Sequence, residues 1–498
     1  MYNKCWCEAV QPADWQVAKI VAIFKQKGST KLPSNYRPIA LLQAFYKFYT
    51  LLIDKRLRIL EHRVWRMQVG FRRDHSTDDA NFLLLRLMEL AHRWQYLHVY
   101  ILFLDWIKCY DRIHHKPLLD ALRRFGLPPQ YLRVLESIYC DLSFFVADAW
   151  GKSAVLRQEQ GLRQGDPLAC FLLLILMTVI MLDCRDAFFA ECARQNIGQI
   201  HSYPERVFGF QDVGFADDTN LIHVHLPSLR ILVKCFLKEA AYYGFFANNA
   251  PQPDGKSFLL AFNPDVAIIR VKDLDGRDFP LVPEAKTLGI VYGQAFQTAA
   301  NVYRARISSM QGSMNQYKFV WRSNVPLKNK VNKMNALVWN KGRWSLHLFP
   351  LLPALRRSID GSQARFLRRI LKLPAAYISR ISHATVRRRC STFRFSTFIF
   401  RSQLRWLGHI LRKPATHPLR RVLFDDRPDL PPRRPPSLHS FHPQRAVRGR
   451  PNVDWGQDLL HKIYRLSGLS RRDVGIIAQD RRRFHLLVER LCSLADQS

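Results

Sequence analysis

Two short stretches decide the fold of this chain: VYILFLD at residues 99–105 and GFADDTNLI at residues 214–222. The first is an unbroken apolar run, which predicts a central strand over 99–104 that is buried on both faces and ends at Asp105. In the second, short strands at 208–214 and 220–225 flank an acidic pair. This pattern predicts a β-hairpin with Asp217 and Asp218 at its tight turn.

The three carboxylates at these strand ends predict a cation site. A carboxylate at the end of a buried strand is costly unless a cation or a hydrogen-bond donor compensates its charge, and two adjacent acids repel each other. If the strands are neighbours in one sheet, Asp105 and Asp217 meet at its edge and form an oxygen site suited to Mg²⁺ and substrate phosphates. Two such ions would activate a 3′-hydroxyl and stabilise a leaving pyrophosphate. Taken alone, the acidic pair is more simply a solvated turn, so the interpretation depends on the surrounding sequence.

Away from these stretches the pattern is mostly helical. A strand is expected at 15–24, and helices at 43–60, 76–94, 116–125, 129–138, 227–243 and, in a basic region, between 301 and 413. The longest apolar run, 168–182, directly follows a polar loop at 161–167 and is shorter than the ~20 residues that a membrane span needs. We interpret it as a buried core helix. Residues 1–7 do not begin a signal peptide, because no apolar segment follows them.

The charge of the chain points to a polyanionic partner. The 498 residues include 76 Lys and Arg against 40 Asp and Glu, a formal net charge of +36. Residues 351–450 alone hold 23 Lys and Arg against 4 Asp and Glu. Such a field attracts nucleic acid or an anionic membrane, and the missing membrane span favours nucleic acid. The ten cysteines show no metal or disulfide spacing, which is typical of reduced thiols in an intracellular protein.

Six blocks of the sequence, in order, resemble the fingers and palm motifs of LINE-type (non-LTR) retrotransposon reverse transcriptases. They are NYRPIALL (35–42), QVGFRRDHST (68–77), FLDWIKCYDRI (103–113), GLRQGDPLA (161–169), FADDTNLI (215–222) and KTLGIVYG (286–293). Two later segments, LRWLGHILRKP (404–414) and RGRPNVDW (448–455), are similar to stretches downstream of the polymerase in that family. The resemblance covers residues 15–295 well and 300–498 more loosely.

The resemblance implies a role for each matching residue. Asp105 and Asp217 match the metal-binding aspartates, and Asp218 matches the second acid of the pair. Tyr110 matches the aromatic residue that blocks a ribose 2′-hydroxyl, and Gln164 and Gly165 match the loop that packs on the incoming nucleotide and template base. Arg37 matches the arginine that grips the triphosphate, and either Lys25 or Lys27 assists it. Lys256 matches the lysine that is a candidate proton donor to pyrophosphate. The spacing of Gly244, Asn248 and Lys256 is wider here than in the family.

The resemblance also implies an α+β right-hand polymerase and its partners. Fingers and palm are expected at 1–295, a helical thumb and basic connector at 296–426, a Pro/Arg-rich linker at 427–447 and a helical tail at 448–498. The implied cofactor is a pair of Mg²⁺ ions, with Mn²⁺ as the alternative. The implied partners are an RNA template, a DNA primer or nicked target DNA, and dNTPs. The implied localisation is intracellular, with the nucleus as the site of action.

Three alternatives to an intact LINE polymerase stay open. A group II intron-type reverse transcriptase is disfavoured by the LINE-like segments of the second half. A catalytically inactive relic that only binds RNA or DNA is disfavoured by the presence of all three acids, the aromatic gate and Gln164. LINE proteins usually carry an endonuclease ahead of the polymerase, whereas this sequence starts almost at the fingers, which predicts a fragment, a degraded copy or a separate nicking partner.

Overall fold

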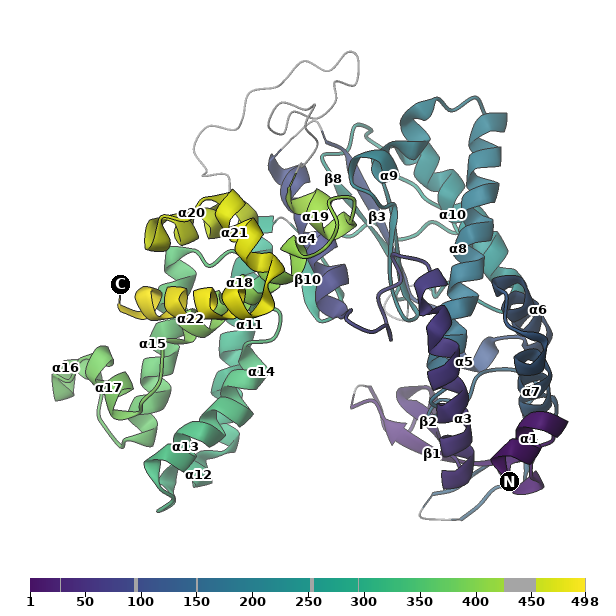
Figure 1. Cartoon of the computed structure of the whole chain (residues 1–498), viewed down its shortest axis with the longest axis horizontal. Helices are drawn as coiled ribbons and strands as arrows, with labels where there is room; N and C mark the ends of the chain where they lie inside the picture. Colours follow the sequence, from purple (N-terminus) through teal and green to yellow (C-terminus); the bar gives the residue numbers. More distant parts are fainter. Residues whose placement is uncertain are drawn as a thin grey trace. The chain divides into compact units, whose positions relative to one another are not determined.

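The computed structural model describes residues 1–26, 28–93, 97–148, 151–250, 255–293, 295–424 and 454–497, and these form an α+β protein (Figure 1). The chain divides into two units, one made of Met1–Ala80 and Val99–Val282, the other of Asn81–His98 and Pro283–Ser498. The division into four domains that the resemblance implies stays a prediction. Its 427–447 linker lies outside the described residues.

The first unit contains two four-stranded sheets, with strand orders β2-β1-β4-β5 and β6-β7-β3-β8. The strands are β1 (Val17–Phe24), β2 (Tyr36–Leu41), β3 (Val99–Leu104), β4 (Ser143–Val146), β5 (Leu156–Arg157), β6 (Asp212–Phe215), β7 (Asp218–His223) and β8 (Phe258–Phe262). The helices are α1 (Tyr2–Glu8), α2 (Ala13–Gln16), α3 (Ala44–Leu57), α5 (Cys109–Arg112), α6 (His115–Phe125), α7 (Pro129–Cys140), α8 (Ala169–Arg194), α9 (Tyr203–Val207) and α10 (Leu226–Tyr242). Three short 3₁₀ turns join them: η1 (Pro33–Asn35), η2 (Arg58–Arg63) and η3 (Gln199–Ser202).

Strand β3 lies in the interior of its sheet, between β7 and β8, and pairs antiparallel with both. All six of its residues are buried. Because side chains alternate along a strand, Tyr100, Leu102 and Leu104 share one face, and they belong to the core that α8 and α10 help to form. Figure 1 shows these two helices side by side next to the strand. The predicted central strand is confirmed at its predicted bounds.

The apolar run at 168–182 forms the first half of α8, a 26-residue helix. Nearly all of that half is buried, from Phe171 to Met181, because α8 packs against both α6 and α10. The predicted core helix is therefore confirmed, and it extends further than predicted. In the part of the chain that the structure describes, no helix combines the length and the apolar character needed to cross a membrane.

The second unit is built from helices and one small hairpin. Its elements are most of α4 (Thr77–Arg93), β9 (Ala285–Thr287), β10 (Ile290–Tyr292), α11 (Ala295–Gln316), α12 (Lys318–Arg322), α13 (Leu327–Met334), the π-helical turn η4 (Asn335–Trp339), α14 (Asn340–Gly342), η5 (Leu346–Leu348), α15 (Pro353–Ile370), α16 (Ala376–Ser379), α17 (His383–Arg389), α18 (Phe395–Leu411), α19 (Pro418–Leu423), α20 (Trp455–Ser467), α21 (Arg471–Gln479) and α22 (Arg481–Gln497). Helices α21 and α22 pack against α18, and α20 packs against α22 (Figure 1). Buried Trp455 joins distant parts of this unit, since its ring nitrogen donates to the His347 carbonyl at 2.9 Å and its ring lies edge-on to Phe82.

A buried carboxyl in β6 should make the stability of the first unit depend on pH. Asp212 is 3% exposed, one of its oxygens accepts a 2.8 Å hydrogen bond from the Trp65 ring nitrogen, and the other has no partner. Burial raises the pKa of Asp212 from 3.8 to about 7. The folded state therefore retains a proton that the unfolded state releases, so the free energy of unfolding should fall as pH rises from about 4 to about 7.

Asp212→Asn should remove this loss, because the amide stays neutral at every pH. At pH 8 the variant is expected to be more stable than the parent by about 1–3 kcal/mol, and at pH 4 the difference should nearly vanish. Urea unfolding of the parent and the variant at several pH values measures the difference in the free energy of unfolding at pH 8 and at pH 4. Exposed Asp14→Asn is the control and should leave the pH profile unchanged. A parent whose stability did not change between pH 4 and pH 8 would contradict the prediction.

Candidate active site

The three carboxylates converge at one edge of the β6-β7-β3-β8 sheet. The last pair between β3 and β7 joins Leu104 to Thr219, so one step further Asp105 lies beside Asp218, the first residue of β7. Asp217 occupies the two-residue turn between β6 and β7, whose ends are closed by the Phe215–Asp218 pair. The predicted hairpin is confirmed, with Asp217 in its turn and Asp218 one residue later, at the start of β7, and the predicted meeting of the two strand ends is confirmed too.

The electrostatics of this cluster favour a cation. Burial, then Asp217 and Asp105, raise the pKa of Asp218 to about 7, and burial and Asp105 raise the pKa of Asp217. No group of three or more His, Cys, Asp or Glu side chains among the described residues is arranged as a ready-made metal site. The donors present are hard carboxylate oxygens, which Mg²⁺ accepts in small number when substrate phosphates and water complete its shell. The residues therefore fit a Mg²⁺ site that depends on its substrate.

Asp105 is held by the segment that follows α10. Asn248 donates its side-chain amide to the Asp105 carboxylate at 2.9 Å, and the Lys256 ammonium lies 3.7 Å from the same oxygen. The Ser257 hydroxyl accepts the backbone N–H of Asp105 at 3.1 Å. Lys256 thus reaches the site despite its wide spacing from Gly244. Asn248 was absent from the predicted site residues, although it stands in the same Gly-Asn-Lys stretch.

Two cations come from the other sheet of this unit. Lys25 follows β1 and donates to the Ser34 carbonyl at 2.8 Å, while Arg37 is exposed on β2, opposite Ile23. Burial, then the charges of Lys256 and Arg37, lower the pKa of Lys25, whereas Asp105 raises it. The charged groups of Lys25, Arg37, Lys256 and Asp105 are therefore near one another. Lys27, the alternative to Lys25, lies outside the described residues.

Tyr110 and the 161–167 loop lie next to each other. The backbone N–H of Leu162 donates to the Tyr110 carbonyl at 2.7 Å, and the Gln164 amide donates to the Asp111 carboxylate at 3.1 Å. Tyr110 is partly buried on α5, and burial, then Cys170 and Asp217, raise its pKa. Gly165 has a φ of 116°, and a Cβ there would lie 2.7 Å from the Ala40 carbonyl oxygen on β2. Only glycine fits this backbone comfortably.

The acidic hairpin is clamped by a segment that carries no predicted site residue. The side-chain oxygen of buried Gln68 accepts the Ala216 N–H at 2.9 Å, and its amide donates to the Ala216 carbonyl at 2.9 Å. The backbone N–H of Val69 also donates to Gly214. Ala216 has a φ of 57°, an uncommon conformation for a residue with a Cβ, which this clamp stabilises. Gln68 opens the QVGFRRDHST block, so a sequence signal existed, but its partner was not evident.

Gly70→Ala should displace Asp217 and Asp218 although the added methyl group meets the Ala216 backbone and not their side chains. A Cβ at Gly70 would lie 2.2 Å from the Ala216 nitrogen, so the turn that carries Asp217 must shift. We expect any activity that depends on the three carboxylates to fall about tenfold to hundredfold, since small misplacements of reacting groups have effects of this size. Gly198→Ala is the matched control, because nothing lies within 4 Å of its Cβ. Equal activity of both variants would mean that the hairpin tolerates displacement.

The arrangement suits one kind of substrate. The three carboxylates share one region with Lys25, Arg37 and Lys256, whose cationic side chains can bind phosphate oxygens. Enzymes that act on polyphosphates use divalent metal ions together with Lys or Arg side chains. These cations bind the phosphate oxygens and stabilise the negative charge on the leaving phosphate or pyrophosphate group. The partly buried ring of Tyr110 and the Gln164 loop add walls next to the same acids.

Comparison with known proteins gives one family model and several relatives. Residues 24–250 match the family model described as reverse transcriptase (RNA-dependent DNA polymerase). The chain is 30% identical over 151 residues to the transposon TX1 uncharacterized 149 kDa protein of Xenopus laevis, covering 30% of this chain and 12% of that protein. It is 30% identical over 162 residues to the RNA-directed DNA polymerase from mobile element jockey of Drosophila melanogaster, covering 32% of this chain and 17% of that protein. The chain thus matches less than a fifth of the length of either relative.

Solved structures give a weaker likeness. Apo telomerase from Candida tropicalis, truncated from its C-terminal domain, aligns with a TM-score of 0.37 at 16% identity, over 59% of this chain and 57% of that structure.

Proposed function

We propose that residues 24–250, which match the reverse transcriptase family model, form a reverse transcriptase domain like those of non-LTR retrotransposon proteins, and that the chain acts as the RNA-directed DNA polymerase of such an element. In this proposal it extends a DNA 3′-hydroxyl, from a primer or a nicked target, on an RNA template with dNTPs as substrates. The observation that carries the proposal is the meeting of Asp105, Asp217 and Asp218 at one sheet edge. The proposed site of action is the nucleus, where genomic DNA is the target.

Asp105 and Asp217 are the proposed ligands of two Mg²⁺ ions, with Mn²⁺ as the alternative. The chemistry that such ions supply when bound is activation of the 3′-hydroxyl and neutralisation of charge on the leaving pyrophosphate. Asp218 adds negative charge beside them. The raised pKa of Asp218, about 7, supports this assignment, because a cation would relieve the repulsion that raises it.

The remaining residues bind and orient the substrates in this proposal. Arg37 and Lys25 grip the triphosphate, a task suited to an exposed guanidinium with a lysine beside it. Gln164 and Gly165 pack on the incoming nucleotide and template base, and Tyr110 excludes a ribose 2′-hydroxyl. Lys256 is the proposed proton donor to pyrophosphate. Its 3.7 Å separation from Asp105 supports that role, because it keeps the ammonium at the site before substrate binds.

We also propose the architecture of a right-hand polymerase. The two sheets of the first unit and their helices correspond to fingers and palm. The helices from α11 onward correspond to a thumb, a basic connector and a tail. The similarity of the two later segments to LINE stretches supports this correspondence over that of a group II intron-type enzyme.

Primer extension tests the function directly. The purified chain, with poly(rA) template, oligo(dT) primer and Mg²⁺, is expected to incorporate dTTP and to stop when EDTA removes the metal. Omission of the template is the control for untemplated addition. A chain that binds the RNA but adds no nucleotide would overturn the proposal and favour the inactive relic.

A further inference from the structure

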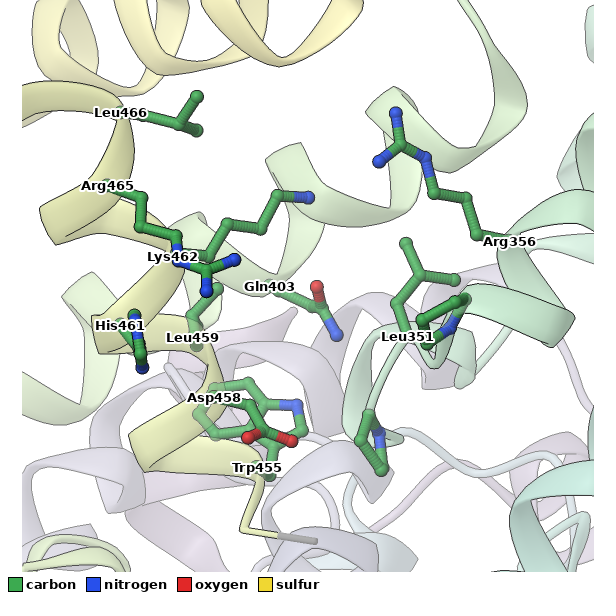
Figure 2. Close-up of a pocket in the computed structure, with 12 residues that line it drawn as sticks. Leu351, Arg356, Gln403, Trp455, Asp458, Leu459, His461, Lys462, Arg465 and Leu466 are labelled. Atoms are coloured by element: carbon green, nitrogen blue, oxygen red, sulfur yellow. The ribbon is translucent and has the colours of Figure 1, made fainter. Parts of the chain in front are cut away.

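A cavity of about 670 Å³ lies within the second unit, away from the three carboxylates in sequence, and is lined by α15, α18, α20 and the loop before α15 (Figure 2). Its wall is held in place by buried polar contacts. The amide of Gln403 donates to the Phe349 carbonyl at 2.9 Å. The Trp455 backbone N–H donates to Glu89 at 3.0 Å, and its ring nitrogen donates to the His347 carbonyl. These contacts make the cavity a built feature of this unit.

Three cations surround the cavity. Figure 2 shows Arg356 on α15 facing Lys462 and Arg465 on α20 across the open space. Asp458 is the one carboxylate among the described residues that line the cavity, and the picture places it on the far side of the open space from Arg356, close to Trp455. Within the part of the chain that the structure describes, Arg356, Lys462 and Arg465 form no ion pair. The charge on the walls therefore has an excess of positive sign.

The surroundings of Lys462 are the strongest evidence that the cavity binds an anion. Its ammonium lies 3.8 Å from the centroid of the Phe400 ring, an attraction that favours the charged form. Burial and the charge of Arg356 oppose it and lower the pKa of Lys462 to about 8. The carboxylate of Asp360, whose charge also reaches Lys462, is already bound by the N–H and hydroxyl of Ser396 at 2.9 and 2.7 Å. Two like charges in one cavity repel each other, and an anion between them would remove that repulsion.

The rest of the lining indicates what the anion is attached to. Leu351, on the wall of Arg356, and Leu459 and Leu466, on the wall of Lys462, give the cavity apolar surface beside its cations (Figure 2). A simple inorganic ion would leave that apolar surface uncovered, whereas a nucleotide unit presents a phosphate together with a sugar and a flat base. Proteins that bind single strands combine a positively charged groove with side chains, usually aromatic, on which bases pack. In this cavity the leucine side chains would provide the apolar contact.

We propose that this cavity binds one nucleotide unit of a single-stranded nucleic acid, with its phosphate between Arg356 and Lys462 and its sugar or base against the leucines. The choice of a nucleic-acid strand as the source of the phosphate rests on the proposed function. The alternative source is a free nucleotide. The cavity would then add a strand-binding position in the second unit to the substrate positions proposed in the first.

The test is binding of a fluorescent 12-nucleotide RNA by the full chain, followed by anisotropy at several salt concentrations. The variant Arg356→Gln with Lys462→Gln is expected to bind at least tenfold more weakly at 0.1 M salt. The slope of log affinity against log salt should be smaller by about 0.7, because each phosphate of a single strand that the protein neutralises adds about 0.7 to it and this pair holds one phosphate. Arg357→Gln is the matched control: it removes one positive charge from the same helix at an exposed position, and its effect should stay below threefold.

A second measurement does not depend on how the variants fold. Acetylation of the parent chain, followed by mass spectrometry, should modify Lys462 in the free protein and be suppressed by the RNA but not by AMP at the same nucleotide concentration. Equal protection by AMP would assign the cavity to free nucleotides and overturn the proposal, as would a double variant that binds like Arg357→Gln. Primer extension by the parent chain is measured separately. If the parent chain extends primers and the double variant binds RNA as tightly as the parent, the cavity proposal is wrong and the proposed polymerase function stands.

Discussion

Asp105→Asn is expected to lower primer extension at least about a thousandfold while leaving RNA binding nearly unchanged. The amide has the size of the carboxylate but not its charge, so the sheet edge should keep its shape and lose affinity for a divalent cation. The loss corresponds to several kcal/mol of transition-state stabilisation. Asp217→Asn should have a comparable effect, because it removes a second charge from the same edge.

Single-turnover extension on poly(rA)/oligo(dT) measures the rate, and RNA anisotropy measures the binding. Asp186→Asn is the matched control, since its carboxylate on α8 is 76% exposed and takes no part in the site. Asn248 and Lys256 both contact the Asp105 carboxylate, so a thermal unfolding curve for each variant checks that the segment after α10 remains in place. Extension at the parent rate by Asp105→Asn would show that the metal assignment is wrong.

Tyr110→Val is expected to raise ribonucleotide incorporation relative to dNTPs by tens- to thousands-fold, about 2–4 kcal/mol of differential transition-state binding. The ring of Tyr110 is close enough to Asp217 for that charge to affect its pKa, and its backbone is bound to the 161–167 loop. A ribose 2′-hydroxyl at the proposed substrate position would meet the ring, so rejection arises from a clash. A smaller side chain relieves the clash without removing a metal ligand.

The measurement is the ratio of kcat/KM for GTP and dGTP on one primer–template. Tyr110→Phe should keep the selectivity of the parent, because the ring and not the hydroxyl excludes the sugar. Tyr242→Val, at a 60% exposed position on α10, should leave both values unchanged. If Tyr110→Val lowered both values together and left their ratio as it was, Tyr110 would be a packing residue.

Local patterns were sufficient to predict the elements that carry the carboxylates. Strand β3 has its predicted bounds, since a run of six apolar residues is typical of a strand that is buried on both faces of its sheet. The hairpin of β6 and β7 was predicted for a similar reason, with each strand shifted by a few residues. Strand ends are less well determined than strands, because the residues at a turn can satisfy their backbone groups in more than one way.

Contacts between distant segments could not be predicted in this way. The bond between Gln68 and Ala216 joins residues 148 positions apart. The pairing of Asn248 and Lys256 with Asp105 depends on how the chain returns after α10. Helix α4 offers another example: its position in the sequence groups it with the first unit, yet most of it belongs to the second.

The sequence by itself determined the strand that ends at Asp105, the acidic hairpin, the buried helix that follows residue 168 and where the acids fall along the chain, because periodicity and apolar runs are properties of neighbouring residues. Tertiary structure alone decided which other side chains meet these acids or one another. Gln68 became a clamp for the acidic turn, Lys256 a partner of Asp105, and Arg356 and Lys462 two walls of one cavity. Each of these contacts depends on the register and packing of segments far apart in sequence, which no local pattern encodes.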